Sequence, residues 1–85
     1  MPYEVRFSRK AERQMARFPD RVFDRIVATA RKLADDPRPG GSKKLKGRDP
    51  VWRLRIGEYR LMYTIFDKDQ LVSIDYVERR TSTTY

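Results

Sequence analysis

The residues best suited to chemistry are three arginines in the second half of the chain. Arg53, Arg55 and Arg60 alternate with apolar residues over two neighbouring segments. A guanidinium keeps its charge at neutral pH and presents a planar set of donors that matches phosphate oxygens. Such a cluster could hold a phosphodiester and stabilise the charge that develops during its cleavage. The alternative is a solvated strand face, since charged side chains are mostly exposed.

Positive charge is concentrated around these arginines. The chain holds 20 Lys and Arg against 12 Asp and Glu, a formal net charge of +8. Residues 38–60 contain eight of the basic residues and two of the acidic ones, a surplus of six. This charge favours a polyanionic partner, which could be nucleic acid, an acidic protein or anionic lipid. Lys43, Lys44 and Lys46 would then follow a nucleic-acid backbone, although they could also serve only to keep a loop soluble.

The composition excludes other chemistries. The sequence has no Cys and no His, which excludes a zinc finger, an iron–sulfur centre, a cysteine nucleophile, a histidine base and disulfide bonds. The carboxylates of Asp35, Asp36, Asp67 and Asp69 fall at expected turns and helix ends, where capping and solubility explain them better than metal binding. We therefore expect no metal site and no cofactor.

The first half of the chain predicts a strand and a pair of helices. Polar and apolar residues alternate over 3–7, which is the period of a half-buried strand. Ser8 is suited to cap a helix over 9–18, and after a proline Asp20 could cap a second helix that ends at Asp36-Pro37. The short turn between the helices predicts an antiparallel hairpin.

The second half of the chain predicts strands. The same alternation occurs in three segments, 52–56, 59–65 and 71–77. Turns separate these segments at Gly57-Glu58 and at 67–70. The predicted order is β-α-α-β-β-β. We expect an α+β fold, with 1–85 forming one domain in which a helix hairpin packs on one face of a small, mostly antiparallel four-stranded sheet.

The period of two also assigns side chains to the two faces of the sheet. With the helices on one side, the side chains that point at them would be Trp52, Leu54, Ile56, Leu61, Tyr63, Ile65, Ile74 and Tyr76. The uncovered side would carry Arg53, Arg55, Arg60, Asp75, Val77 and Arg79. Arginines that face one another across two strands repel, and a bound anion would remove that cost.

The hydrophobic content is that of a folded protein without a membrane segment. The chain is 39% hydrophobic and 12% aromatic, enough for a folded domain. No stretch approaches the roughly 20 apolar residues of a membrane span, and the first residues lack the apolar core of a signal peptide. We expect a soluble, cytoplasmic protein with no membrane partner.

Two motifs resemble those of a known family. K-L-K-G at 44–47 is followed by W-R-L-R-I-G-E-Y-R-L-M-Y at 52–63. Together they resemble the RelE/ParE superfamily of toxins from type II toxin–antitoxin systems. The opening strand and the helix hairpin also fit, so the resemblance covers the whole chain. For RelE-like members it implies ribosome-dependent cleavage of mRNA without a metal, in which the 2′-hydroxyl of the RNA attacks the adjacent phosphate.

The resemblance also implies site residues. The catalytic set would be Arg53, Arg55, Arg60, Arg79 and Tyr85, and the RNA-binding set would be Lys43, Lys44, Lys46 and Arg80. The role of Arg79 could fall to Arg80, because the spacing of the tail varies among relatives. The best-known RelE-like enzymes have lysines where this chain has Arg53 and Arg55, and a guanidinium is a poor proton acceptor at neutral pH. Tyr85 would then transfer the proton or stack on a base, unless it is simply a C-terminal Tyr.

A second class of toxin shares the same expected fold. A ParE-like toxin would inhibit DNA gyrase by binding, without nuclease activity, so the fold does not decide between the two. The arginines favour the RelE-like mRNA interferase. Either toxin implies a cognate antitoxin with an acidic or amphipathic segment that folds on the basic surface. The nuclease would have mRNA and the ribosome as further partners.

Overall fold

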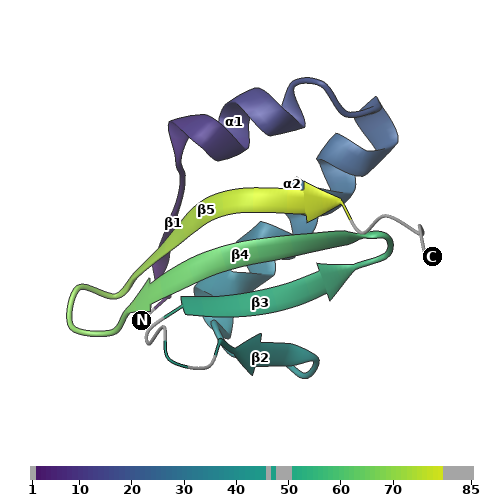
Figure 1. Ribbon diagram of the computed structural model, residues 1–85. Helices are drawn as coiled ribbons and strands as arrows, with labels where there is room; N and C mark the ends of the chain where they lie inside the picture. The colour runs from purple at the N-terminus through teal and green to yellow at the C-terminus, as the bar shows by residue number, and fades with distance from the viewer. Residues whose placement is uncertain (1, 46, 48–50, 80–85) are drawn as a thin grey trace.

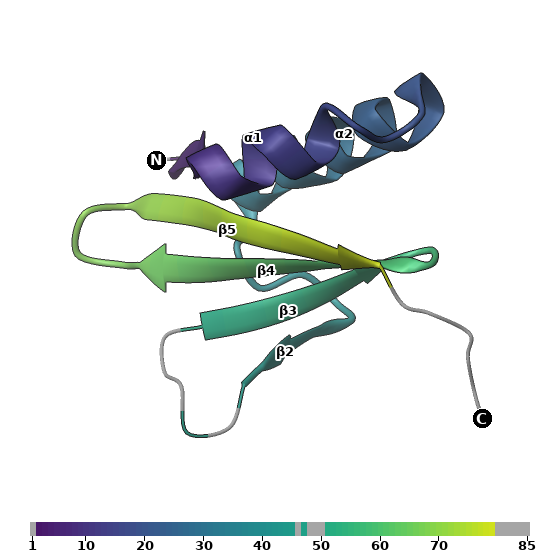
Figure 2. The ribbon, with the colours of Figure 1, turned by 45° about the horizontal axis from the view of Figure 1, so that its top comes forward.

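The computed structural model describes residues 2–45, 47 and 51–79 (Figure 1). Its elements are β1 (Glu4–Phe7), α1 (Arg9–Met15), α2 (Asp20–Asp35), β2 (Ser42–Lys44), β3 (Val51–Ile56), β4 (Tyr59–Phe66) and β5 (Leu71–Arg79). Both helices lie over one face of the sheet, which confirms the predicted α+β fold with its helix hairpin (Figure 2). The sheet has five strands, where four were predicted.

The additional strand is β2, in the basic segment before β3. Its three residues, Ser42–Lys44, pair antiparallel with Leu54, Arg53 and Trp52. Two of these three residues are lysines, so the segment has no apolar alternation from which a strand could be predicted. Backbone pairing with β3 is what makes this segment a strand.

The strand order is β1-β5-β4-β3-β2, with β1 parallel to β5 and every other pair antiparallel. In Figure 1, α2 passes behind the strands, so the viewer looks at the side of the sheet that the helices leave uncovered. We call this side the open face, to which Arg53, Arg55 and Arg60 belong. The side packed against the helices, to which Leu54 and Ile56 belong, is the helix face.

The predicted helix starts are confirmed only in part. Ser8 caps α1, since its Oγ accepts a hydrogen bond from the Ala11 N–H at 3.0 Å. α1 then ends at Met15, sooner than predicted. The expected Asp20 cap is wrong, because Asp20 is already the first residue of α2 and Pro19 holds the cap position without a side-chain hydrogen bond.

The core lies between the helices and the helix face. Six side chains predicted to point inward are buried there: Leu54, Ile56, Leu61, Tyr63, Ile65 and Ile74. Their partners on the helices are Ala11, Met15, Ile26, Ala30 and Leu33. Trp52 is half-buried and packs against the same cluster. The regular β3–β4 ladder therefore follows the predicted alternation.

The alternation reverses in the last strand. Tyr63 pairs with Ile74, but Met62 pairs with Tyr76, which leaves Asp75 as the extra residue of a β-bulge. Beyond a one-residue shift of register, side chains change face. Val77 is therefore buried, with 2% exposure, and its predicted place on the open face is wrong.

Two other predicted positions change for the same reason. Tyr76 lies opposite Met62 on the open face, so its predicted place in the core is wrong. Arg79 lies opposite Tyr59 on the helix face, so its predicted place beside the other arginines is wrong as well. The bulge thus moves an aromatic ring to the open face and an arginine away from it.

Side chains of α1 and of its N-cap hold the bulged part of β5. β1 pairs with Leu71–Ile74, and further along the same edge Gln14 takes the place of a strand partner. Its Nε2 donates to the Val77 carbonyl at 2.8 Å, and its Oε1 accepts from the Val77 N–H at 2.8 Å. Ser8 Oγ donates to the Asp75 carbonyl at 2.6 Å. These bonds satisfy edge groups that would otherwise have to pair elsewhere.

Tyr63 ties the sheet to the segment that follows α2. Its side chain is fully buried, and its hydroxyl donates to the Pro37 carbonyl at 2.9 Å. Burial raises the pKa of the Tyr63 hydroxyl to about 12. This hydrogen bond anchors the start of the loop that leads into β2.

Candidate functional site

Three of the predicted catalytic arginines lie together on the open face. Arg55 is directly opposite Arg60, and Arg53 is opposite Met62. Lys43 of β2 is opposite Arg53, so it extends the same row. Residues directly opposite in antiparallel strands have neighbouring side chains on one face. We call Lys43, Arg53, Arg55 and Arg60 the arginine cluster.

Contacts within the described residues leave much of this cluster able to bind an anion. Arg55 Nε donates to the Gly57 carbonyl at 3.3 Å. Arg60 Nη1 lies 3.6 Å from Glu78 Oε1, which is longer than a hydrogen bond. Within residues 2–45, 47 and 51–79, the side chain of Arg53 makes no hydrogen bond or ion pair. Because Arg55 and Arg60 face each other with like charge, a phosphate between them would relieve their repulsion.

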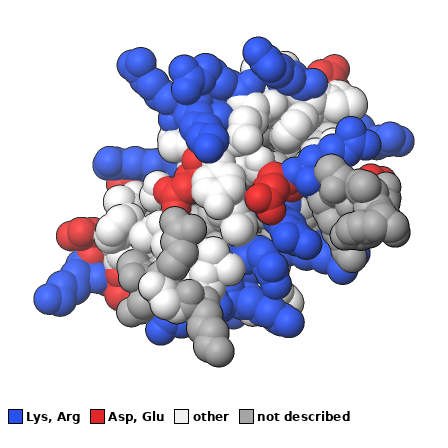
Figure 3. Space-filling model, in the orientation of Figure 1, with Lys and Arg blue, Asp and Glu red and all other residues white. Residues whose placement is uncertain are grey.

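Strand β5 adds an aromatic ring and two carboxylates to the open face. Asp75 accepts hydrogen bonds from the hydroxyls of Thr64 and Ser73, at 2.6 and 2.9 Å. Glu78 lies opposite Arg60, and Tyr76 is two residues before it. Figure 3 shows this face, where Asp and Glu side chains lie among the Lys and Arg. Sequence reasoning missed Tyr76 and Glu78 because their face depends on the bulge, which the strand period does not reveal.

The other predicted site residues lie apart from the cluster or outside the described residues. Arg79 Nη2 is 3.9 Å from Glu58 Oε1, and its guanidinium is 6.0 Å from the centroid of the Tyr59 ring. Lys44 is opposite Trp52, on the helix face. The residues outside the described part of the chain are Lys46, Arg80 and Tyr85.

Arg38 belongs to the basic segment but is engaged elsewhere. Its Nη2 and Nη1 donate to the Asp67 carboxylate at 2.8 and 3.3 Å, and the Tyr3 hydroxyl donates to the same carboxylate at 2.6 Å. These hydrogen bonds lower the pKa of Asp67, and the one from Arg38 has the largest effect. The Arg38 guanidinium also lies 5.3 Å from the centroid of the Trp52 ring. Asp67 of the β4–β5 turn therefore joins Arg38 to Tyr3 near the start of the chain, and Arg38 is not part of the cluster.

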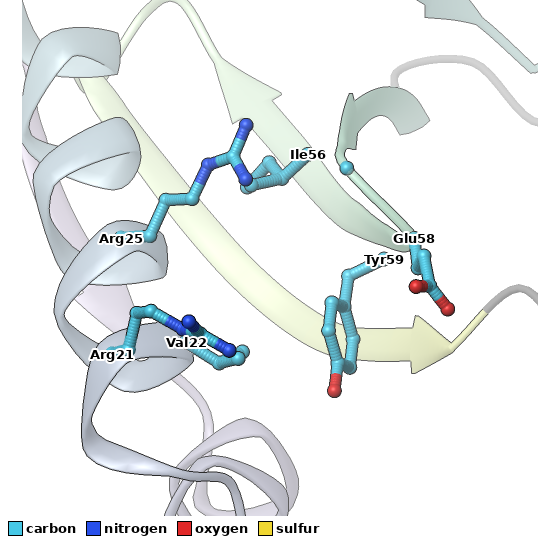
Figure 4. Close-up of a pocket in the computed structure, with 7 residues that line it drawn as sticks. Arg21, Val22, Arg25, Ile56, Glu58 and Tyr59 are labelled. Carbon is cyan, nitrogen blue, oxygen red and sulfur yellow. The ribbon is translucent and has the colours of Figure 1, made fainter.

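A second basic surface lies on the helix face, between α2 and the β3–β4 turn (Figure 4). It is a groove of about 380 Å³ lined by Arg21, Val22, Arg25, Ile56, Gly57, Glu58 and Tyr59. Arg21 and Arg25 extend from α2 toward the hairpin and form a basic wall beside apolar Val22 and Ile56. This combination suits an acidic amphipathic segment. Sequence reasoning missed the groove, although the spacing of Arg21 and Arg25 next to the apolar stripe of α2 was a usable signal.

The positively charged Lys and Arg side chains are the groups on these surfaces best able to bind a ligand. Among the described residues, no three acidic side chains come close enough to hold a metal ion. The described helices include none that is long and apolar enough to cross a membrane. The arginine cluster can bind a phosphate and stabilise added negative charge on it.

The sequence is similar to known proteins over nearly its whole length. Residues 5–82 match the family of the ParE toxin of the type II toxin–antitoxin system parDE. Toxin RelG of Mycobacterium tuberculosis is 33% identical over 81 residues, which cover 94% of this chain and 93% of that protein.

Solved structures show the same relationship. A chain of the toxin–antitoxin complex RelBE2 from Mycobacterium tuberculosis is 34% identical with a TM-score of 0.82, over 94% of this chain and 93% of that one. A chain of the RelE–RelB complex from Pyrococcus horikoshii shares the fold with a TM-score of 0.86 at 24% identity, over 98% of this chain and 100% of that one. The protein therefore belongs to the ParE toxin family, within the RelE/ParE superfamily of type II toxin–antitoxin toxins, and is RelE-like rather than ParE-like.

Proposed function

We propose that this toxin is a metal-independent endoribonuclease that cleaves mRNA on the ribosome and so inhibits translation in the cytoplasm. The observation that carries the proposal is the pairing of Arg55 with Arg60 on the open face, next to Arg53. Facing guanidinium groups can bind both sides of one phosphate. The similarity to RelE-type toxins supports the same activity.

The reaction would be an attack of the RNA 2′-hydroxyl on the adjacent phosphate. Negative charge then builds up on the non-bridging oxygens, and donors fixed at those oxygens lower the barrier. Arg53, Arg55 and Arg60 supply such donors on rigid strands. Lys43 extends the row along the RNA backbone, and Lys46 and Arg80 would add salt-dependent contacts, whereas Lys44 lies on the helix face. Tyr85 completes the proposed catalytic set near the end of the chain, with Arg80 in the place of Arg79, because Arg79 lies on the helix face.

The ribosome would supply the orientation of the substrate. The arginine cluster lies on the uncovered side of a small sheet, where the RNA could adopt many geometries. Fixing the 2′-oxygen in line with the leaving oxygen can contribute as much as about 7–11 kcal/mol to the reaction. The protein should therefore cut mRNA on translating ribosomes and leave free mRNA largely intact.

The toxin would be held inactive by a cognate antitoxin. The relatives from Mycobacterium tuberculosis and Pyrococcus horikoshii were solved as toxin–antitoxin complexes. The groove on the helix face offers a basic wall and an apolar floor, which suit an acidic or amphipathic segment of such a partner.

The test is cleavage of a defined mRNA by the purified protein. Programmed ribosomes should yield fragments with 2′,3′-cyclic or 3′-phosphate ends, at chelator levels that leave ribosomal magnesium in place. A single deoxyribose at the cleaved position should block the cut, because it removes the attacking hydroxyl. Intact message on ribosomes that the toxin has inhibited would reject the proposal.

A second candidate function comes from the family match itself. The matching family is that of the ParE toxin, and ParE-like inhibition of DNA gyrase would need no nuclease. The same protein preparation should leave gyrase supercoiling unaffected at concentrations that cut mRNA. Inhibited supercoiling together with intact message would replace the nuclease with the gyrase inhibitor.

A further inference from the structure

The proposed cleavage needs a group that takes the proton from the attacking 2′-hydroxyl. The arginine cluster is poorly suited to this step, because a guanidinium loses its proton only above a pH of about 12 and a lysine only near about 10. A carboxylate is ionised at neutral pH and can accept a proton directly. A base on this surface is therefore to be sought among the carboxylates of the open face.

Glu78 is the described open-face carboxylate that lies against the arginine cluster. It is directly opposite Arg60, with Oε1 at 3.6 Å from Arg60 Nη1, and its side chain is 48% exposed. Asp75 is already engaged, since both of its oxygens accept hydrogen bonds from neighbouring hydroxyls. Glu58 lies in the hairpin turn beside Arg79 of the helix face.

The backbone that carries Glu78 is firmly held. Its neighbour Val77 is buried and makes two hydrogen bonds of 2.8 Å to the Gln14 side chain. The carboxylate itself is not locked, because 3.6 Å to Arg60 is longer than a hydrogen bond. Glu78 thus combines a fixed position with oxygens that are available to a substrate. Arg60 on β4, and Arg55 opposite it on β3, are the charged groups that face it on the sheet.

From this geometry we infer that Glu78 is the general base of the cleavage, an assignment that rests on the proposed function. A carboxylate oxygen of Glu78 takes the proton of the 2′-hydroxyl while the 2′-oxygen forms its bond to phosphorus. The bond from phosphorus to the 5′-oxygen breaks, and the leaving oxygen takes a proton from water. The products are a 2′,3′-cyclic phosphate and a 5′-hydroxyl, and Glu78 then releases its proton to solvent.

Because Glu78 and Arg60 are paired across two strands, their side chains can act on neighbouring atoms of the same nucleotide. Arg60 donates to the non-bridging oxygens of the phosphate that the 2′-oxygen attacks. Positions directly opposite in antiparallel strands have Cβ atoms about 5 Å apart, so both side chains can reach one nucleotide.

The decisive variant is Glu78→Gln, which keeps the size of the side chain but removes the proton acceptor. Single-turnover cleavage of mRNA on ribosomes should slow by about 100- to 10,000-fold. Affinity for RNA should stay equal or rise, because the substitution removes a negative charge beside the arginine cluster. Glu12→Gln removes the same charge from an exposed position on α1 and should cut at the wild-type rate.

A second variant separates a base from a structural role. Glu78→Ala should be as slow as Glu78→Gln and should regain part of its rate when formate is added, because a small carboxylate can take the proton in the vacated space. Chloride at the same ionic strength should give no such rescue. Glu78→Asp should keep part of the wild-type rate.

The outcomes separate this inference from the function on which it rests. A wild-type protein that leaves mRNA intact on ribosomes rejects the nuclease and the base together. A wild-type protein that cuts, with a Glu78→Gln variant that cuts equally fast or faster, overturns the base alone and reduces Glu78 to a counter-ion of Arg60. Loss of cleavage that comes with an equal loss of RNA affinity, or without formate rescue, also overturns it.

Discussion

The two basic surfaces of this toxin use the same residue type on different elements. On the open face, Arg55 and Arg60 face each other across paired strands. In the groove, Arg21 and Arg25 extend from one helix beside apolar Val22 and Ile56. Charges that face each other can bind one phosphate from two sides, whereas a basic wall beside an apolar floor suits a peptide with acidic and apolar side chains. The element that carries an arginine thus decides which ligand it fits.

The largest effect that should separate the two surfaces is the loss of cleavage in Arg60→Ala. Removing one donor from a developing oxyanion costs about 100- to 1,000-fold in rate. The fold should remain, because Arg60 lies on the open face and contributes little to the core. The measurements are ribosome-dependent cleavage, growth inhibition and antitoxin affinity, of which only the first two should fall.

Arg31→Ala is the matched control for that variant. Arg31 is exposed on α2, and its substitution removes the same charge. It should leave the cleavage rate within about threefold, because surface charges far from the phosphate are screened by salt. A fully toxic Arg60→Ala protein would contradict the assignment of the open face to catalysis.

The salt dependence of binding should also differ between the two surfaces. For a protein that neutralises about four phosphates of single-stranded RNA, raising salt from 50 to 200 mM should weaken binding roughly 50-fold. Substituting Arg53 by Ala should make the plot of log affinity against log salt less steep by about 0.7, which is the contribution of one phosphate contact. Antitoxin binding should depend less on salt, because apolar contacts in the groove are not screened. RNA affinity that is flat across this range would indicate a protein as the main target of the open face.

The same contrast of elements explains how far the sequence could predict the site. The β3–β4 ladder is regular, so the period of two placed Arg53, Arg55 and Arg60 on one face and Leu54 and Ile56 on the other, as the structure shows. Ser8 was recognised as a cap because its bond to the backbone is local. Features determined by residues close together in the sequence could therefore be predicted from it.

The positions that sequence reasoning misplaced depend on distant contacts. The bulge at Asp75 carries no Gly or Pro to mark it, and it is held by Ser8 and Gln14, more than 60 positions earlier in the chain. Counting alternate residues through the bulge placed Val77 and Arg79 on the wrong face. Glu78 became a candidate base only once its pairing with Arg60 was known. A one-residue shift therefore decides which side chains of β5 lie on the open face.

The open face also depends on the packing behind it, which Tyr63→Phe should reveal. The substitution leaves the buried Pro37 carbonyl without its hydrogen bond, at a cost of about 1–3 kcal/mol in the free energy of unfolding. The pKa of this hydroxyl is raised from 10.0 to about 12, so the stabilisation is fully present below pH 10 and is lost as pH rises through 12. In urea unfolding, the difference in free energy of unfolding between the wild type and Tyr63→Phe should be smaller at pH 11 than at pH 8. An equal advantage at both pH values would contradict the burial of this hydroxyl.

The smallest effect concerns Gly57, the residue at which the two surfaces meet. Its carbonyl accepts the bond from Arg55 of the open face, and a Cβ placed on it would lie 3.2 Å from Arg25 Nη1 of the groove. Its φ of +59° is a left-handed conformation, so Gly57→Ala should cost about 1–2 kcal/mol in the free energy of unfolding. Gly40→Ala, where nothing lies within 4 Å of the added Cβ, should change stability by less than about 0.5 kcal/mol.

Gly57→Ala should weaken antitoxin binding and leave cleavage almost unchanged. Arg25 can yield to the new methyl group because its guanidinium is the far end of a flexible side chain, and the move displaces the basic wall of the groove. Arg55 and Arg60 stay paired through the β3–β4 ladder, so cleavage should remain within about threefold while antitoxin affinity falls measurably. If cleavage fell and antitoxin affinity stayed constant, the two surfaces would have to exchange their proposed ligands.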